Sequence, residues 1–227
     1  MLYIGTLLGV FMVVFGIGQR LIDIGSNATG YMNGVKNSLD GFLLPVCISV
    51  PIFLAVFSHE LSSKSMQCIL GHGLTRGKLI TAKLLDAAIL LAGVFIIITI
   101  VVLFMASPDY AISNRQMGIA MAAVWLRALR FLGYICFSAM VMFLTNSAAL
   151  GIISCVAFSV VLRLVFMIMS HLGDISIYDY TIDGLLDWAY KSIEAGEPGF
   201  QIIPVVLYIV ASLAVTVFFF NRKEFEF

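Results

Sequence analysis

Six apolar stretches, separated by polar segments, dominate the hydropathy pattern of this chain. They cover residues 2–18, 42–57, 79–106, 117–144, 148–171 and 200–220. A helix needs about 20 apolar residues to cross a hydrocarbon layer of about 30 Å, and irregular backbone cannot face lipid. The pattern therefore predicts an all-α polytopic membrane protein, with six transmembrane helices in a single domain over 1–227. The first two stretches are short, so we expect their helices to extend into neighbouring residues.

Composition supports a chain that is solvated mainly by lipid. Hydrophobic residues make up 61% and charged residues 11%, with a mean hydropathy of +1.06 and a formal net charge of zero. Soluble domains average about 25% charged residues. The absence of a basic excess gives no reason to expect nucleic acid as a partner. The cysteines show no paired spacing with each other or with histidine, so we predict no metal site and no disulfide.

Two loops of opposite charge set the expected orientation. Residues 173–199 hold many acidic side chains against a single lysine, whereas loop 58–78 and the turn after it are basic. Loops rich in Lys and Arg stay in the cytosol. With six spans, this places both termini in the cytosol of a multi-pass cell-membrane protein. The turn 145–147 is also expected in the cytosol, although it has no basic residue. The basic residues concerned are Lys64, Arg76, Lys78 and Lys83.

Three prolines fall inside apolar stretches. Pro45 and Pro51 lie in the second, and Pro204 lies near the start of the sixth. Each removes a helix hydrogen bond and is expected to kink its helix unless a neighbour compensates. The pattern fits either a flexible gate-lining helix or prolines that are simply tolerated in membrane helices.

The basic loop itself has the pattern of a short interfacial helix. Apolar residues recur in it at three- and four-residue spacing and so share one helical face. Gly71 and Gly73 then end the helix, and Thr75 is a plausible N-cap for the next one. From the residues alone, this helix is either an anchor for the positive-inside rule or a docking element for a cytosolic partner. The apolar face consists of Met66, Ile69, Leu70 and Leu74.

The end of this loop resembles the signature of type-2 ABC transporter permeases. In that family an acidic residue ends the second span, as Glu60 does here, and a G-x-S/T-R-x-x-(I/L)-x-x-x-K-like phrase opens the third. The positions that fill this phrase are Gly73, Thr75, Arg76, Ile80 and Lys83. The family's six-span plan, with both termini in the cytosol, fits the whole chain. Members usually carry an amphipathic elbow helix before the first span, whereas this chain enters apolar sequence almost at once.

The resemblance implies that residues 62–70 form a coupling helix, which docks into a groove on a separate ATPase subunit. The chain has no phosphate-binding G-x-x-x-x-G-K-[ST] loop, so ATP and Mg²⁺ would be bound by that partner and no cofactor by this chain. Lys78, Lys83 and Asp86 would lie at the inner membrane surface, with Asp86 paired to Lys83. The residues that would dock are Glu60, Leu61, Lys64, Met66, Ile69, Leu70, Gly71, Gly73, Thr75 and Arg76.

Three arginines lie in the fourth and fifth stretches. A central Arg costs roughly 2.5–3.5 kcal/mol on insertion scales, so each needs a partner or an escape route. We expect Arg127 and Arg130 to reach outward to lipid phosphates, because the fourth helix is long enough to protrude. The alternative, which is equally open for Arg163, is a polar cargo path or outer gate paired with acids of the outer loop such as Asp174 or Asp179.

The outer loop contains a second short helix with an aromatic residue suited to the membrane interface. The run 183–190 is expected to start with Asp183 as its N-cap and to offer Leu185, Leu186 and Trp188 to the membrane surface. The resemblance implies that such external helices close the exit path. A solvated acidic loop with one amphipathic turn is the alternative.

The resemblance implies a function as the membrane-spanning half of an ABC exporter. Such a permease pairs with itself or a related permease, contacts membrane lipid, and moves its cargo by alternating access. The spans are rich in apolar, aromatic and Met residues, which suggests an amphipathic or hydrophobic cargo such as a peptide, antibiotic or lipid. No residue is expected to be catalytic. Two other classes remain open: an ion-coupled secondary transporter, and a non-transporting immunity or scaffold protein.

Overall fold

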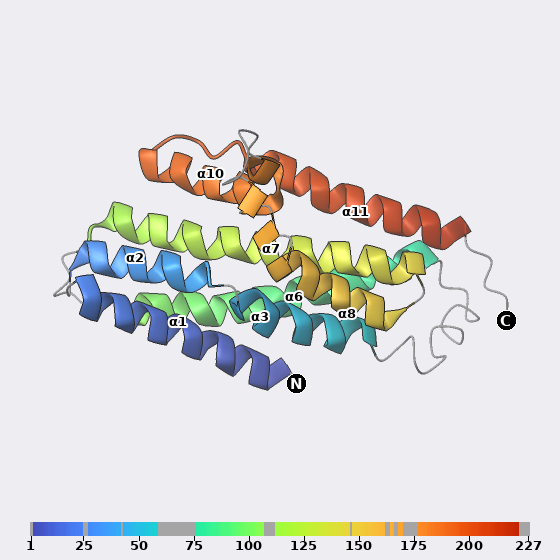
Figure 1. Ribbon diagram of the computed structural model, residues 1–227, viewed down its shortest axis with the longest axis horizontal. Coiled ribbons are helices and arrows are strands. Elements are labelled where there is room, and N and C mark those ends of the chain that lie inside the picture. The colour runs from blue at the N-terminus through green and yellow to red at the C-terminus, as the bar shows by residue number, and fades with distance from the viewer. Residues whose placement is uncertain are drawn as a thin grey trace.

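The computed structural model describes residues 2–24, 27–41, 43–58, 76–106, 112–145, 147–161, 164–165, 168–169 and 177–222. Every regular element within these ranges is a helix (Figure 1). The α-helices are α1 (Leu2–Ile24), α2 (Ala28–Leu39), α3 (Leu43–Phe53), α6 (Arg76–Phe104), α7 (Asn114–Thr145), α8 (Ala148–Val156), α10 (Ile182–Ala195) and α11 (Ile202–Arg222). Two π-helical turns, η1 (Leu54–Ser58) and η3 (Ala157–Val161), continue α3 and α8, and the 3₁₀ turn η4 (Ile177–Tyr180) precedes α10.

Four of these helices, α1, α6, α7 and α11, are long and apolar enough to cross a membrane. A fifth candidate is the pair formed by α2 and α3 with η1, which is bent by 48°. Residues Ala148–Val161 form a shorter apolar helix. The expectation of an all-helical chain with several membrane-spanning helices is therefore confirmed. The described ranges give four candidate spans, or five with the bent pair, against the six expected from hydropathy.

The bent pair of α2 and α3 begins earlier in the chain than the second apolar stretch does. Its polar first part, α2, precedes the apolar stretch 42–57 and is capped by Asn27, whose Oδ1 accepts a hydrogen bond from Gly30 N at 2.8 Å. The helix stops at Asp40 and resumes at Leu43. The bend therefore lies before Pro45 rather than at it.

The prolines have milder effects than expected. Pro45 and Pro204 are each the third residue of their helix, where the missing N–H would have no intrahelical acceptor. Pro51 lies inside α3, and the backbone widens into the π turn η1 three residues later. A lost hydrogen bond in mid-helix is a common cause of such local rearrangement.

Helix α1 packs along both halves of the bent pair through glycines. A Cβ on Gly5 would collide with the backbone oxygen of Cys47 in α3, and a Cβ on Gly16 would collide with Ser38 in α2. Gly34 of α2 makes the reciprocal approach, since its Cβ would lie 3.0 Å from the backbone of Ile17. Small residues let membrane helices approach closely enough for van der Waals packing to stabilise them. One continuous helix thus spans the break between Leu39 and Leu43.

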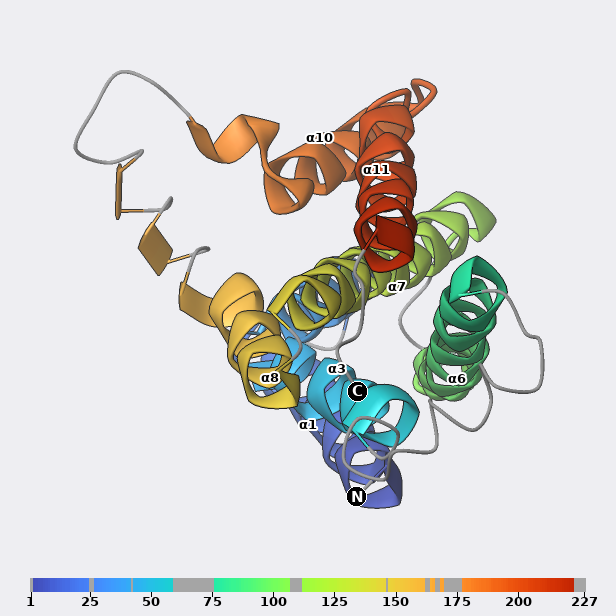
Figure 2. The ribbon, with the colours of Figure 1, turned by 90° about the vertical axis from the view of Figure 1, so that its right-hand side faces the viewer.

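Helix α7 lies at the centre of the arrangement. Figure 2 shows it with α6 and α8 on either side and α10 and α11 above. In its most apolar window 61% of the residues are buried, against 17–33% for the other three candidate spans. The outer faces of α1, α6 and α11 consequently present large apolar side chains to their surroundings, as lipid-facing helices do.

The helix in the loop before α11 is present, but its start differs from the prediction. Thr181, not Asp183, is the N-cap of α10, and its Oγ1 accepts a hydrogen bond from Gly184 N at 3.2 Å. Asp183 lies within the first turn, where its side chain is free to point into the bundle. The helix ends at Gly196, which adopts the left-handed conformation (φ 87°) that favours glycine.

Candidate site: a buried ion-pair cluster beside an apolar cavity

Arg127 and Arg130 are the largest buried polar side chains of the described bundle. Their exposed fractions are 1% and 0%. Being three residues apart on α7, they share one helical face, and this face points towards α2 and α10. The expectation that they reach outward to lipid phosphates is therefore wrong, and the reason is that acidic partners are available inside.

The partner of Arg127 on one side is Asp40, at the break between α2 and α3. Nε and Nη2 of Arg127 donate to the two oxygens of Asp40 at 2.7 and 2.9 Å, which is a bidentate pair. Nη2 also donates to Asp187 Oδ1 of α10 at 2.9 Å. Bidentate guanidinium–carboxylate pairs are strong and fix the relative orientation of both groups. Arg127 thus joins α2, α7 and α10.

Arg130 makes a second set of contacts to the same two helices. Its Nε lies 2.8 Å from Asp183 Oδ1, and Nη2 lies 3.3 Å from Asp187 Oδ1. Nη1 lies 3.4 Å from Asp40 Oδ1. Removing a guanidinium from water costs several kcal/mol, which carboxylates at these distances offset. The predicted acid partners were Asp174 and Asp179. Asp174 lies outside the described residues, and in the described part of the chain the ion pairs of the two arginines are made by Asp40, Asp183 and Asp187 instead of Asp179.

Two tyrosines complete the cluster. The Tyr134 hydroxyl, one turn beyond Arg130 on α7, lies 2.8 Å from both oxygens of Asp183. The Tyr178 hydroxyl of η4 donates to Asp187 Oδ2 at 2.8 Å. Close packing of η4 against α10 requires Gly184, because a Cβ there would collide with the backbone oxygen of Tyr178. The sequence of the loop is therefore arranged to bring both carboxylates onto α7.

A small polar cavity of about 150 Å³ opens beside the cluster, between α2 and α10. Lys36 stands over the ring of Tyr190 there, with Nζ 5.0 Å from the ring centre. Burial, with a smaller contribution from Glu194, raises the pKa of Tyr190 above its ordinary value. The charged residues that line this cavity are Lys36, Asp40, Asp179, Asp187 and Lys191. Together with Arg127, Arg130 and Asp183 they give equal numbers of positive and negative groups, so the cluster is formally neutral.

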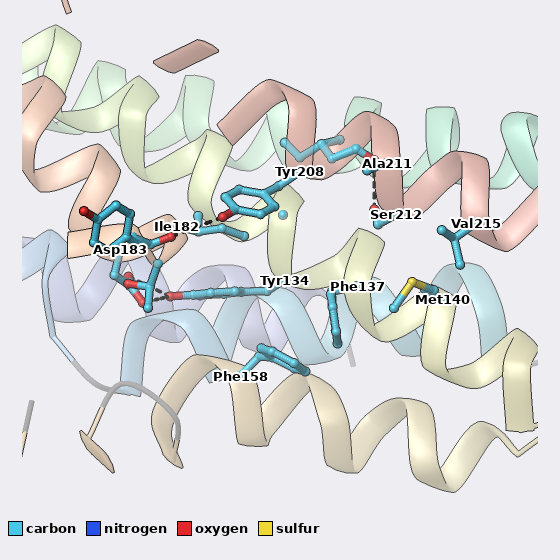
Figure 3. Close-up of a pocket in the computed structure, with 14 residues that line it drawn as sticks. Tyr134, Phe137, Met140, Phe158, Ile182, Asp183, Tyr208, Ala211, Ser212 and Val215 are labelled. Carbon is cyan, nitrogen blue, oxygen red and sulfur yellow. Dashed lines mark hydrogen bonds between the residues drawn. The ribbon is translucent and has the colours of Figure 1, made fainter. Parts of the chain in front are cut away.

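On the other side of Asp183 lies a larger and mostly apolar cavity of about 410 Å³. It runs between α7, η3, the start of α10, and α11 (Figure 3). Asp183 and Tyr134 form its polar end, while Phe137, Met140 and Val215 line the apolar part. This volume is within the range of about 300–1,000 Å³ typical of small-molecule sites. Asp183 and Tyr134 thus belong to both the cluster and the cavity.

Most residues expected to dock an ATPase lie outside the described part of the chain. This holds for Glu60, Leu61, Lys64, Met66, Ile69, Leu70, Gly71, Gly73 and Thr75, and also for Arg163. Arg76 begins α6, and Lys78, Lys83 and Asp86 follow on its first turns, with Lys83 half-buried and Lys78 and Asp86 exposed. Trp188 is 55% exposed beside the small polar cavity, as a side chain at a membrane interface would be.

Sequence reasoning missed Asp40, Asp187 and Tyr134 as partners of the arginines. The sequence pattern indicated Asp187 only as one of the acidic residues of loop 173–199, and it gave no role to Asp40. One signal was available in the sequence: arginines within apolar stretches need acidic partners, and Asp40 is an acid directly before the stretch 42–57. Charges near a membrane interior normally pair with one another.

Across the described residues no group of three or more metal-binding side chains converges, and three of the cysteines, Cys47, Cys136 and Cys155, are unpaired thiols. The candidate site is thus built from ion pairs, hydroxyl groups and apolar walls. Comparison with protein-family models, with curated proteins and with solved structures gives no match to this chain.

Proposed function

We propose that this chain is the membrane-spanning permease subunit of an ATP-driven exporter that moves an amphipathic or hydrophobic cargo. The observation that supports cargo binding is the cavity of about 410 Å³ between α7, η3, α10 and α11, with apolar walls and Asp183 at one end. A site of this kind suits a molecule with an apolar body and one polar group. The cargo would be a peptide, an antibiotic or a lipid.

The energy source in this proposal rests on the sequence. The resemblance to type-2 ABC permeases over Glu60–Lys83 implies six spans with both termini in the cytosol of the cell membrane. It also implies a coupling helix at 62–70, a second permease of the same or a related kind, and ATPase subunits that bind ATP and Mg²⁺. In this scheme the cluster joining α2, α7 and α10 serves as an outer gate, with Arg163 and Trp188 near the exit path.

Alternating access requires at least two states that bind cargo differently. The ion-pair cluster favours the state in which α2, α7 and α10 are held together, because the carboxylates of two separate helices meet the two guanidinium groups of a third. Opening between these helices would separate charges that now neutralise one another. ATP hydrolysis on a partner would supply the free energy for that step.

The proposal is tested by purifying the tagged full chain, in mild detergent, from the cells that make it. We expect a nucleotide-hydrolysing subunit to copurify. Ile69→Ser, on the predicted docking face, should lower the amount recovered about ten-fold, which corresponds to about 1.4 kcal/mol of docking free energy. Gln67→Ser, on the opposite face of the same predicted helix, serves as the matched control and should have no effect. Absence of any ATPase, or equal recovery with both variants, would contradict the proposal.

An ion-coupled secondary transporter is the second candidate, and the break between α2 and α3 favours it. Such transporters often use discontinuous helices with charged groups near the break, and here Asp40 lies at the break and pairs with buried Arg127. Efflux of cargo from cells distinguishes the two. Transport that stops with a protonophore while cellular ATP is maintained supports ion coupling, whereas transport that stops only on ATP depletion supports the exporter.

A further inference from the structure

Resting on the proposed function, we infer that the cavity of about 410 Å³ selects amphiphiles whose polar head is a protonated amine. This deepens the proposal by naming the chemical class of the head group. The polar groups that face the cavity, and the acceptors to which their hydroxyl groups donate, determine which head group fits.

Asp183 is the one charged side chain among the residues that line the cavity. It is 5% exposed and lies at one end of the space, beside the hydroxyl group of Tyr134 (Figure 3). A carboxylate offers about four lone-pair directions. The Tyr134 hydroxyl and the Arg130 guanidinium occupy only part of this capacity, so a further donor can be accepted from the cavity side.

The hydroxyl groups around the cavity have already donated their hydrogens within the protein. Tyr134 donates to Asp183, and Thr181 donates to the backbone oxygen of Tyr178 at 2.7 Å. Ser212 donates to the backbone oxygen of Ile209 at 2.8 Å, and Tyr208 to that of Tyr180 at 3.4 Å. A hydroxyl has one hydrogen and two lone pairs. Thr181, Ser212 and Tyr208 therefore present acceptors to a ligand, while Tyr180, with its side chain 75% exposed, lies at the rim.

The first turn of α10 also borders the cavity, and free backbone N–H groups at a helix start attract anions. Asp183 lies in that same turn, and its negative charge offsets the positive end of the helix. A carboxylate or phosphate head would have to approach Asp183 closely. A head that carries only donors and a positive charge is instead attracted by the carboxylate of Asp183.

The remaining walls suit both parts of an alkylamine. The rings of Tyr134 and Tyr208 flank the polar end, and aromatic faces attract cations. Phe137 and Phe158, with ring centres 4.0 Å apart, and Met140 line the apolar part where a hydrocarbon chain would lie. The same cavity thus pairs acceptors at one end with a flexible apolar wall at the other.

The test uses the full chain alone, in nanodiscs of phosphatidylcholine at about pH 7, where an alkylamine is protonated. Radiolabelled tetradecylamine, tetradecanol and tetradecanoic acid share one hydrocarbon chain and differ only in the head. After subtraction of uptake by protein-free nanodiscs, we expect saturable binding of the amine, tighter than that of the alcohol by about ten-fold, as one charge-assisted hydrogen bond predicts. The acid should bind weakest.

Ala211→Trp places a large ring in the cavity and should keep the amine from reaching Asp183. We expect binding to weaken at least about ten-fold, as the loss of one hydrogen bond to a charged group predicts. Val210→Trp puts the same ring on a neighbouring exposed position of α11 that does not line the cavity, and should leave binding unchanged. Asp183→Asn, where it folds, should abolish the preference for amine over alcohol.

Binding of the acid or the alcohol as tight as that of the amine would overturn the inference, as would an absence of saturable amine binding. Equal effects of the two tryptophan variants would do so as well. Because no ATPase is present, these outcomes are independent of whether a nucleotide-hydrolysing subunit copurifies with the chain. Amine binding without an ATPase partner would leave this inference intact and overturn the ATP-driven function.

Discussion

Two successive parts of α7 differ in how they contact their neighbours. Around Arg127 and Arg130 the helix surface is charged, and carboxylates from α2 and α10 pair with both guanidinium groups. From Tyr134 to Met140 the surface is apolar, and it borders an open cavity. In the first part directional ion pairs fix which helices meet. In the second part apolar side chains make non-directional contacts and leave a cavity of about 410 Å³ open. The difference indicates that this membrane bundle uses charge to define its architecture and apolar surface to adapt.

Arg130→Met should produce the largest effect, because it leaves Asp183 buried and unpaired. Removing one partner of a buried ion pair costs about 3–5 kcal/mol, and we expect a marked fall in the midpoint of thermal unfolding in detergent. The double variant Arg130→Met with Asp183→Leu replaces the pair by apolar groups and should recover most of the loss. Arg115→Met, on the exposed start of the same helix, is the control and should change little. A small effect of Arg130→Met would show that the cluster does not fix the helices.

Two methionines of α7 give the next test. Met142 is 1% exposed in packed surroundings, whereas Met140 borders the open cavity. Met142→Ala should cost about 2 kcal/mol, the low end for buried Met→Ala changes, since lipid replaces water as the reference and packing is the main loss. Met140→Ala only enlarges an existing space and should cost clearly less. Equal shifts in the unfolding midpoint would mean that the cavity is closed by packing in the folded protein.

Tyr134→Phe probes the boundary between the two parts. It removes the hydroxyl that donates to Asp183 but keeps the ring on the cavity wall. We expect a loss of about 1.5–3 kcal/mol, typical of a hydrogen bond to a charged group. Amine binding should persist, because the carboxylate gains a free lone pair. Loss of binding in a variant that still folds would assign the hydroxyl, not the carboxylate, to the ligand.

The smallest effect is expected for Lys36→Met, at the exposed side of the cluster. The ammonium over the Tyr190 ring contributes about 0.5–1 kcal/mol at a partly exposed site. A change of the unfolding midpoint close to the error of the measurement would agree with this. A loss as large as that for Arg130→Met would show that Lys36 belongs to the core of the cluster.

The sequence was sufficient to predict the helical, membrane-type character, because runs such as 79–106 and 117–144 exceed the length that a bilayer requires. It also placed a short helix before the last span. It did not reveal α2, whose polar composition resembles a loop. This helix packs against α1 and α7, and its Tyr31 hydroxyl donates to Val102 O of α6 at 2.7 Å. Tertiary contacts of this kind override local pattern.

The ion-pair partners were beyond sequence reasoning for a related reason. Asp40 and Arg127 are separated by 87 positions, and only the path of the bent pair beside α7 brings them together. The N-cap of α10 is Thr181 and not the predicted Asp183, and the local sequence does not separate the two because both residue types cap helices well. The Asp183 side chain points into the bundle instead, where it contacts Arg130 and Tyr134.

The glycines of α1 fix the positions of α2 and α3 along that helix. Gly5 is matched to α3 and Gly16 to α2, so the number of residues between them sets where the two segments stand. One inserted residue would rotate the second contact by about 100° about the helix axis and turn a bulkier neighbour towards Ser38. Homologous chains should therefore keep this spacing fixed, even where the side chains between the glycines vary.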